Sequence, residues 1–272
     1  MKRVIASVVA YENDRDTLTK SIESFLNSAV DTLLYLVDNS PTDNLKDLIS
    51  DPRVIYIYIG KNIGFGPGHN VGMRLSLDSA DYHLVLDPDV YFGPEVIPRL
   101  LQFMDSNKGI GLIMPKVLYP DGSLQRLCKL LPTPYTLIMR RFLKFLTPLL
   151  NRENYTYELQ FADYDQIIDA PFLSGCFMFF RNEALRQVGL FDERFFLYSE
   201  DIDLSRRIHQ RYRTVYYPHT SIFHFFGKAP YKNLRALLVN IHSAVTYFNK
   251  WGWIHDPERG RINRETIRGL NR

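Results

Sequence analysis

Short apolar runs alternate with amphipathic segments along the first third of the chain. A strand that is buried on both faces is a continuous apolar run, whereas a surface helix repeats apolar residues every three or four positions. The predicted strands are residues 4–10, 33–37, 54–59 and 83–86, and the predicted helices are 17–27, 44–49 and one that begins near Asn70. This βαβα order predicts an α/β fold with a mainly parallel sheet, helices on both faces, and ligands at the carboxyl ends of the strands.

The second half of the chain has a less regular pattern. Residues 109–118 are predicted as short strands, 172–181 as a strand, 212–217 with 221–226 as a terminal strand pair, and 231–253 as a helical extension. One helix is expected to follow Asn182 as its cap, and another to run from Glu200 to about residue 211. No repeat or clear linker interrupts the chain, so we expect one domain at residues 1–226 and a C-terminal helical extension at 227–272 packed on it.

Composition narrows the class of protein. The 272 residues are 46% hydrophobic, which is enough for a continuous core, and a net charge of +3 from 33 basic and 30 acidic residues gives no reason to expect nucleic acid as a partner. Cys128 and Cys176 lack zinc or disulfide spacing, which fits a reducing cytosol. The apolar run after Met1 is short for a signal peptide and is interpreted as a strand. No run is long enough to span a membrane, so we expect any membrane contact to be peripheral.

Three acidic or imidazole elements carry the candidate chemistry: Asp87-Pro88-Asp89 after an apolar run, Glu200-Asp201 at the start of a helix, and His224 among aromatic residues. Each has an ordinary structural explanation: a solvated turn, acids that favour a helix N-terminus, and a core histidine. Together they suit a hard divalent cation with a carboxylate base beside it. With no thiolate expected at the site, we predict Mn²⁺ or Mg²⁺ rather than zinc.

Other residues at predicted strand ends are candidates for binding a nucleotide. Tyr11 is placed to pack against a base, and Asp38 to accept the imide N–H of uracil or thymine. Asn62 and the glycine-rich residues 64–72 allow close approach of the backbone to ribose and diphosphate, because glycine lacks Cβ. The glycine spacing matches neither a dinucleotide fingerprint nor a P-loop, which disfavours a dehydrogenase or a kinase.

The chain resembles the family 2 inverting glycosyltransferases of GT-A fold, and among them the rhamnosyltransferase-like members. The resemblance covers about residues 3–226 and is carried by four segments, 37–43, 62–72, 86–90 and 174–203. It implies transfer of a sugar from a nucleotide-sugar with inversion at the anomeric carbon.

The resemblance also implies a role for each candidate residue. Asp201 would be the general base, Asp89 a direct metal ligand, His224 a second metal ligand, and Asp87 a contact of the ribose or the metal. Glu200 would bind the acceptor or orient the base. The donor-binding candidates are Tyr11, Asp38, Asn62, Gly64 and Asn70. Asp203 is expected one turn deeper, paired with Arg206 or Arg207.

The resemblance implies L-rhamnose on dTDP as the donor, with a UDP-linked hexose as the alternative. It also implies a glycan or a lipid-diphosphate-linked saccharide as the acceptor, in cell-surface polysaccharide synthesis. Residues 135–150 mix basic and large apolar side chains, which suits either an anionic membrane surface or a flap over the acceptor cleft. Residues 228–272 carry nine Lys or Arg against three acids, a second candidate surface for lipid phosphates. The alternative for residues 228–272 is a frayed, soluble tail. We therefore expect a cytoplasmic protein, with the inner face of the cell membrane as one candidate location.

Two other classes compete with a transferase of this kind. A non-catalytic nucleotide-sugar-binding module would keep the fold and lose Asp89 or Asp201, but both are present. A nucleotidyltransferase would be expected to carry a glycine-rich, basic loop soon after the first strand, and residues 10–19 contain Arg15 and no glycine.

Overall fold

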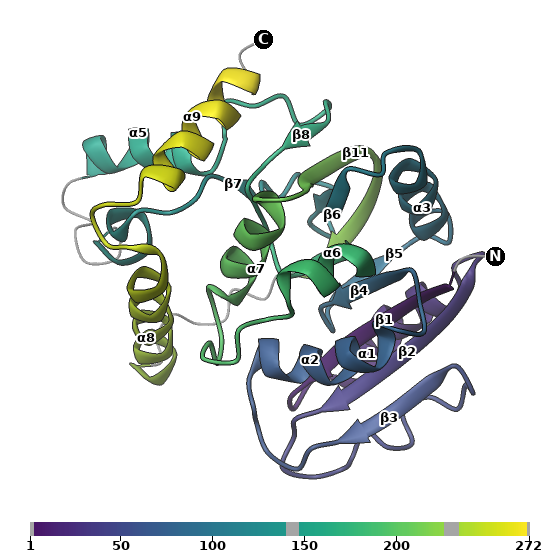
Figure 1. Cartoon of the computed structure of the whole chain (residues 1–272). Helices are drawn as coiled ribbons and strands as arrows, with labels where there is room; N and C mark the ends of the chain where they lie inside the picture. Colours follow the sequence, from purple (N-terminus) through teal and green to yellow (C-terminus); the bar gives the residue numbers. More distant parts are fainter. Residues whose placement is uncertain (1–2, 140–146, 226–233, 271–272) are drawn as a thin grey trace.

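The computed structural model describes residues 3–139, 147–225 and 234–270 (Figure 1). The strands are β1 (Arg3–Ala10), β2 (Asp31–Asp38), β3 (Val54–Tyr58), β4 (Tyr82–Leu86), β5 (Val90–Phe92), β6 (Ile110–Leu118), β7 (Cys128–Lys129), β8 (Ile168–Asp169), β9 (Phe172–Leu173), β10 (Phe177–Arg181) and β11 (Arg213–His224). The helices are α1 (Arg15–Leu26), α2 (Phe65–Ser76), α3 (Val96–Ser106), the π-helix η1 (Tyr135–Met139), α5 (Thr147–Tyr157), α6 (Asn182–Val188), α7 (Glu200–His209), α8 (Leu234–Trp251) and α9 (Pro257–Leu270).

The central sheet has the strand order β3-β2-β1-β4-β10-β6-β11-β5, and β8 pairs with β11. Strands β1 to β4 are parallel to one another, with Ala10 opposite Asp38 and Val8 opposite Leu86. Strand β10 is antiparallel to both of its neighbours, β4 and β6, and so joins the parallel first half of the sheet to the second half. The expected α/β fold with a mostly parallel central sheet is confirmed in this mixed form.

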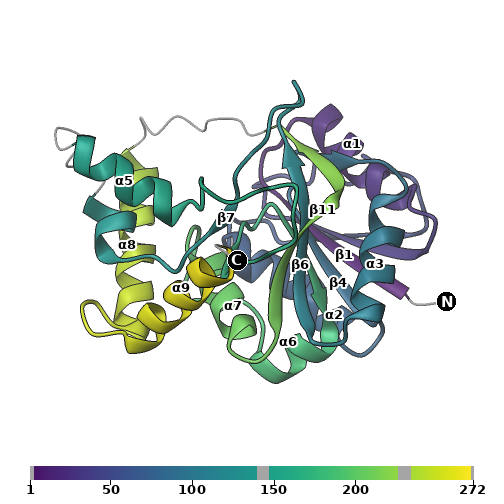
Figure 2. The ribbon, with the colours of Figure 1, turned by 90° about the horizontal axis from the view of Figure 1, so that it is seen from above.

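Successive residues of β1 serve opposite faces of the sheet because side chains alternate along a strand. Val8 belongs to the large core that includes Ile22 of α1, whereas Ile5 and Val9 pack in a separate cluster with Val71 of α2. Figure 2 shows α1 and α3 on one side of the sheet. Coverage of both faces explains why the strands are apolar runs rather than alternating patterns.

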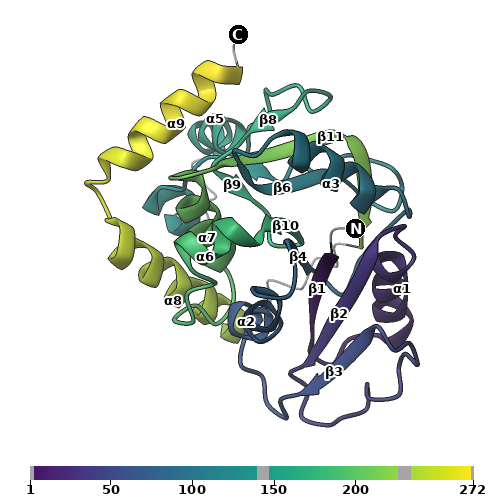
Figure 3. The same ribbon diagram turned by 45° about the vertical axis from the view of Figure 1, so that its right-hand side comes forward.

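The C-terminal helices pack on α7. Arg206 of α7 and Asp256, which precedes α9, form a bidentate ion pair at 2.7 and 2.8 Å, with side chains 1% and 2% exposed. Figures 1 and 3 show α8 and α9 at the side of the molecule away from β3. Within the described ranges, no helix combines the length and apolar character needed to cross a bilayer.

Two expectations in the first half of the chain were wrong. Residues 44–47 form a turn rather than a helix, because so short a segment closes only isolated turn bonds such as Lys46 N–H to Asp43 O (3.0 Å). Helix α2 begins at Phe65 rather than near Asn70. Its glycines looked like loop residues, but a Cβ at Gly68 would lie 2.9 Å from Val9, so glycine permits close packing of this helix on β1.

Three expectations in the second half also needed correction. Residues 110–118 form one strand, whereas 172–181 divide into β9 and β10. Asn182 is the first residue of α6 rather than its cap, and its amide donates to the carbonyls of Ser76 and Ala80. The predicted terminal pair is one long strand, β11, because a register shift between Tyr217 and Ser221 lets the chain continue past Pro218.

Candidate active site

The Asp87-Pro88-Asp89 segment is a tight turn between β4 and β5. The Val90 N–H donates to Asp87 O (3.2 Å), which closes the turn. The backbone of Asp87 is also held from two sides, because its N–H donates to Cys176 O (3.0 Å) and its carbonyl accepts from Ser21 Oγ (3.0 Å). The turn is therefore fixed by α1 and by the segment before β10.

Asp87, Asp89 and His224 converge at this turn. One potential ligand atom from each residue lies within 4.8 Å of the others, and His224 Nε2 is 3.4 Å from Asp89 Oδ1. The antiparallel pairing of β11 with β5 produces this convergence, because it sets His224 opposite Val90. Two carboxylates and an imidazole are donors that suit Mn²⁺ or Mg²⁺. The residues thus fit the predicted cation by their chemistry and mutual distance.

Gln125 fixes the orientation of the His224 ring. Its amide nitrogen donates to the carbonyls of His224 (2.9 Å) and Leu118 (3.3 Å), so its oxygen faces His224 Nδ1 at 3.0 Å. Nδ1 must then carry the proton, and Nε2 faces Asp89 with its lone pair when the imidazole is neutral. A metal-ligating histidine commonly has such a partner on its other nitrogen.

Charges around His224 favour its protonated form when no cation competes. Burial lowers the pKa of His224, but Cys176, Asp89 and Asp87 together outweigh burial and raise it. The Cys176 thiol therefore lies beside His224, although its sulfur does not belong to the group of converging ligand atoms.

Asp201 lies in the first turn of α7, close enough to Asp87 to affect its charge. Burial raises the pKa of Asp201, whereas hydrogen bonds from Gly175 N–H (3.0 Å) and Ile202 N–H (2.9 Å) stabilise its ionised form. Burial, then Asp89 and Asp201, raise the pKa of Asp87 to about 7. Burial and Asp201 raise the pKa of Glu200 to about 8, and Glu200 Oε2 is buried with no hydrogen-bond partner among the described residues. The candidate metal ligands and the candidate base thus share one acidic, partly desolvated region.

The chain enters α7 through an uncommon backbone conformation. Tyr198 and Ser199 both have positive φ, 72° and 69°, directly before Glu200 and Asp201. Consecutive non-glycine residues in this region carry strain and persist only where the surroundings hold them.

Gly64 supports the approach to α7 from α2. Its φ is +97°, and a Cβ there would lie 2.2 Å from Phe196 O. That same carbonyl accepts from Phe65 N–H (2.9 Å). The predicted donor-binding residue Gly64 therefore contacts the segment that leads to Asp201.

The remaining predicted site residues lie at the same edge of the sheet with different surroundings. Tyr11, just after β1, is 45% exposed. Asp38, at the end of β2, is buried, and its oxygens accept from Ser40 N–H (2.9 Å) and Tyr56 Oη (2.7 Å). Asn62 is exposed and accepts from Gly64 N–H (3.0 Å).

Asn70 differs from these, because its amide is buried and engaged by the segment 191–193. It accepts from Phe191 N–H (3.0 Å) and donates to Phe191 O (2.9 Å) and Glu193 Oε1 (3.0 Å). Asp203 pairs with Arg207 at 2.9 Å, one of the two partners expected for it.

Two residues near the acidic cluster, Gln125 and Lys129, could not be recognised as site residues from the sequence around them. Gln125 is 99 positions from His224, and no recognisable motif surrounds it. Lys129 of β7 acts on Asp201, where its charge lowers the pKa against the effect of burial. Its place follows from the pairing of β7 with β9, which a single sequence does not reveal.

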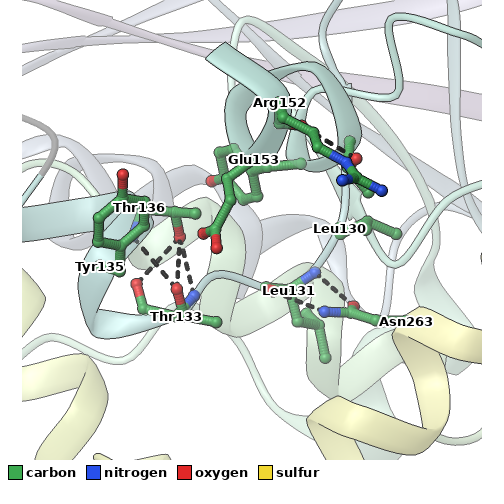
Figure 4. Close-up of a pocket in the computed structure, with 10 residues that line it drawn as sticks. Leu130, Leu131, Thr133, Tyr135, Thr136, Arg152, Glu153 and Asn263 are labelled. Carbon is green, nitrogen blue, oxygen red and sulfur yellow. Dashed lines mark hydrogen bonds between the residues drawn. The ribbon is translucent and has the colours of Figure 1, made fainter. Parts of the chain in front are cut away.

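A pocket of about 640 Å³ is lined in part by Leu130 and Leu131, the two residues that follow Lys129 in the chain (Figure 4). Figure 4 shows Glu153 reaching from α5 toward Thr133. The residues that line the pocket are Leu130, Leu131, Thr133, Tyr135, Thr136, Arg152, Glu153, Thr156, Tyr157 and Asn263. The pocket thus offers both apolar walls and hydroxyl groups.

The parallel half of the sheet, followed by the acidic turn at Asp87–Asp89 and by β11 with His224, has the GT-A fold of solved glycosyltransferases. The chain belongs to glycosyl transferase family 2: the model of that family matches residues 7–189.

Curated relatives include rhamnosyl- and hexosyltransferases. The chain is 28% identical over 243 residues, 83% of this chain and 78% of the relative, to N-acetylglucosaminyl-diphospho-decaprenol L-rhamnosyltransferase of Mycobacterium tuberculosis. It is 28% identical over 202 residues to the low-salt glycan biosynthesis hexosyltransferase Agl10 of Haloferax volcanii, covering 74% of this chain and 59% of the relative.

Solved structures share the fold at low identity. GalNAc-T7, solved with UDP, GalNAc and Mn²⁺, has a TM-score of 0.62 at 13% identity; the match covers 82% of this chain but only 43% of GalNAc-T7. The mannosyltransferase PcManGT from Pyrobaculum calidifontis, solved with GDP-Man and Mn²⁺, has a TM-score of 0.62 at 12% identity, covering 99% of this chain and 75% of PcManGT.

Proposed function

We propose that this protein transfers L-rhamnose from dTDP-rhamnose, with inversion, to a hydroxyl of a lipid-diphosphate-linked saccharide in cell-surface polysaccharide synthesis. The observation that carries the proposal is the convergence of Asp87, Asp89 and His224 beside Asp201. The rhamnosyltransferase relative, aligned over most of both chains, supports the sugar and the acceptor class.

Asp201 is the proposed general base. A carboxylate with a raised pKa removes a hydroxyl proton more effectively than a fully solvated one, and such catalysis contributes about 10²–10⁴-fold. The Gly175 and Ile202 N–H groups hold its two oxygens in place. As Asp201 takes the proton, the acceptor oxygen bonds to the anomeric carbon and the bond to the nucleoside diphosphate breaks, so the configuration inverts.

The leaving diphosphate needs compensating charge. Asp89 and His224, with Asp87 beside them, are the residues that would hold Mn²⁺ or Mg²⁺. The bound cation supplies positive charge to the phosphate oxygens. Gln125 keeps His224 Nε2 directed at this position by accepting a hydrogen bond from Nδ1–H.

The donor's nucleoside is proposed to lie along the edge formed by the first three strands. Tyr11 is exposed there and offers a ring face, while Asn62 and Gly64 lie directly before α2, with Gly64 as its N-cap. Asp38 contributes at the base-binding end, by one of its remaining lone pairs or through the Tyr56 hydroxyl that it orients.

The acceptor is proposed to lie on the other side of Asp201, toward the pocket. Lys129 provides positive charge for the acceptor's phosphates, and the pocket beyond it holds apolar and hydroxyl-bearing parts of the acceptor. Thr156→Trp, which would fill the pocket, should raise the KM for the acceptor by about tenfold and leave the KM for the donor unchanged. An acceptor KM equal to that of the wild type would show that the acceptor does not bind in this pocket.

A UDP-linked hexose is the second donor class that we propose, and the hexosyltransferase relative supports a hexose as the transferred sugar. Purified protein with Mn²⁺ and a lipid-diphosphate-linked N-acetylglucosamine acceptor should be given dTDP-rhamnose, UDP-glucose and UDP-galactose in parallel. Release of dTDP with a rhamnosylated product supports the first proposal, and release of UDP supports the second. No product with any of these donors would favour a binding module, whereas release of pyrophosphate in a separate reaction with dTTP or UTP and a sugar 1-phosphate would indicate a nucleotidyltransferase.

We further propose that the enzyme works as a peripheral protein at the cytoplasmic face of the membrane, where a lipid-linked acceptor would be found. The described part of 228–272 supports this with exposed Arg261, Arg264 and Arg268 on α9. The segment 135–150 falls partly outside the described residues, and its contact with a membrane or with the acceptor stays a prediction. Binding to vesicles with anionic lipid, tested by sedimentation, would check the membrane contact.

A further inference from the structure

We infer that Lys250 of α8 is a positioning residue for the base Asp201, and that it acts by tying the entry segment 192–199 to α7. The inference rests on the proposed function, because it explains how the base of that reaction is held. Lys250 lies well beyond residues 7–189, the region matched by the family model.

Lys250 bridges the two ends of the structure that leads into α7. Its Nζ lies 2.8 Å from Asp192 Oδ2 and 2.7 Å from Asp203 Oδ1. Asp203 is fully buried and sits two residues after Asp201, and its N–H donates to Ser199 O (3.0 Å). One ammonium group therefore joins the start of the entry segment to the first turn of the catalytic helix.

The rest of α8 contacts the same two elements. Ser243 Oγ donates to Leu197 O (2.8 Å), and Trp251 Nε1 donates to Asp203 Oδ1 (2.8 Å). Phe195 of the entry segment and Ile202 of α7 pack in one apolar cluster with Phe248. Polar and apolar contacts of α8 thus hold both sides of the strained pair Tyr198 and Ser199.

This arrangement has a consequence for the position of Asp201. Two consecutive residues with positive φ relax toward ordinary backbone conformations unless the flanking segments are fixed. Relaxation would rotate the first turn of α7 and move Asp201 relative to Asp87 and Asp89. Because misplacement of about 1 Å costs up to about 10²-fold in rate, the loss should fall on kcat rather than on donor binding.

The test compares Lys250→Met with the matched control Lys108→Met, which removes a surface lysine paired with Asp105 in α3. We expect K250M to lower kcat by about 10- to 100-fold with donor KM within about twofold, K108M to behave as wild type, and Lys250→Arg to recover much of the rate. Asp192→Asn cuts the other end of the bridge, so the double variant K250M/D192N should be no slower than the slower single variant. Wild-type kcat in K250M, or fully additive losses in the double variant, would overturn the inference.

A readout independent of turnover separates this inference from the proposed function. Hydrogen exchange of amides 192–203 should be faster in K250M than in K108M, whereas exchange of the amides in the central sheet should be the same in both variants. Failure of the wild type to transfer any sugar would refute the proposed function, whereas unchanged exchange at 192–203 would refute the bridge itself. If K250M does not fold, Ser243→Ala replaces it, since it removes one hydroxyl contact with the same segment and should also lower kcat selectively.

Discussion

Replacement of Asp256 by alanine should destabilise the protein strongly, because this carboxylate has two functions. It forms the bidentate pair with Arg206, whose side chain is 1% exposed and lies with its guanidinium carbon 4.0 Å from the centre of the Trp251 ring. It also precedes Pro257, the first residue of α9, and accepts from Arg259 N–H at 2.9 Å, which caps the helix.

The magnitude follows from these contacts. Removing one partner of a buried ion pair costs about 3–5 kcal/mol, and losing a cap costs about 1 kcal/mol, so Asp256→Ala should lower the free energy of unfolding by about 4–6 kcal/mol. Glu258→Ala is the matched control on the same helix. Glu258 contacts Arg206 at 3.2 Å but is 34% exposed, so its loss should cost less than about 1 kcal/mol.

Urea unfolding measured by tryptophan fluorescence is a suitable assay, because both tryptophans of the chain, Trp251 and Trp253, lie in the C-terminal extension. Circular dichroism of the same samples reports the whole fold, and separate transitions in D256A would mean that α8 and α9 detach first. A loss below about 1 kcal/mol in D256A, equal to that in the Glu258 variant, would refute the reasoning.

The pKa of Asp256 gives the same pair a dependence on pH. Burial raises the pKa of this carboxyl, but hydrogen bonds from Arg206 and Arg259 outweigh burial and lower it below its usual value. A carboxyl with a lowered folded-state pKa stabilises the protein above its unfolded pKa of about 3.9 and loses that contribution as the pH falls through the folded value. The wild type should therefore lose its advantage over D256A below about pH 4.

Other predictions concern the site. Asp201→Asn should bind nucleoside diphosphate with Mn²⁺ as the wild type does, by calorimetry, but transfer sugar at least about 10²-fold more slowly; normal turnover would exclude Asp201 as the base. Gln125→Leu should weaken Mn²⁺ binding about 10- to 100-fold in a calorimetric titration, and unchanged affinity would deny Gln125 its orienting role. Gly64→Ala should lower the melting temperature sharply, because its Cβ would meet Phe196 O, whereas Gly109→Ala meets nothing within 4 Å and should melt as wild type; equal melting temperatures would show that the Gly64 contact can relax.

The first half of the fold was predictable because its signals are local. Buried parallel strands are written as apolar runs, and residues that follow them reach one edge of the sheet, so Tyr11, Asp38 and Asp87 could be assigned to that edge in advance. The extent of α2 was not predictable in the same way. Its glycines disfavour a helix by propensity, and packing against β1 reverses that preference.

The site was predictable only where a sequence motif consists of the residue types that the chemistry requires. Asp89 and His224 were expected to converge, and the pairing of β5 with β11 brings them to 3.4 Å. Gln125 and Lys250 act through contacts with distant segments, and nothing in their neighbouring residues indicates a partner. Their functions depend on tertiary contacts, which cannot be read from a single sequence.

The insertion of β10 between β4 and β6 affects the order in which the sheet can form during synthesis. During synthesis β4 emerges long before residues 177–181, so the β4 edge of the parallel half of the sheet has unpaired backbone groups until β10 is made. An open strand edge of this kind can pair with other chains. Nascent chains that stop before β10 should therefore depend on chaperones, whereas those that include it can close the sheet by themselves.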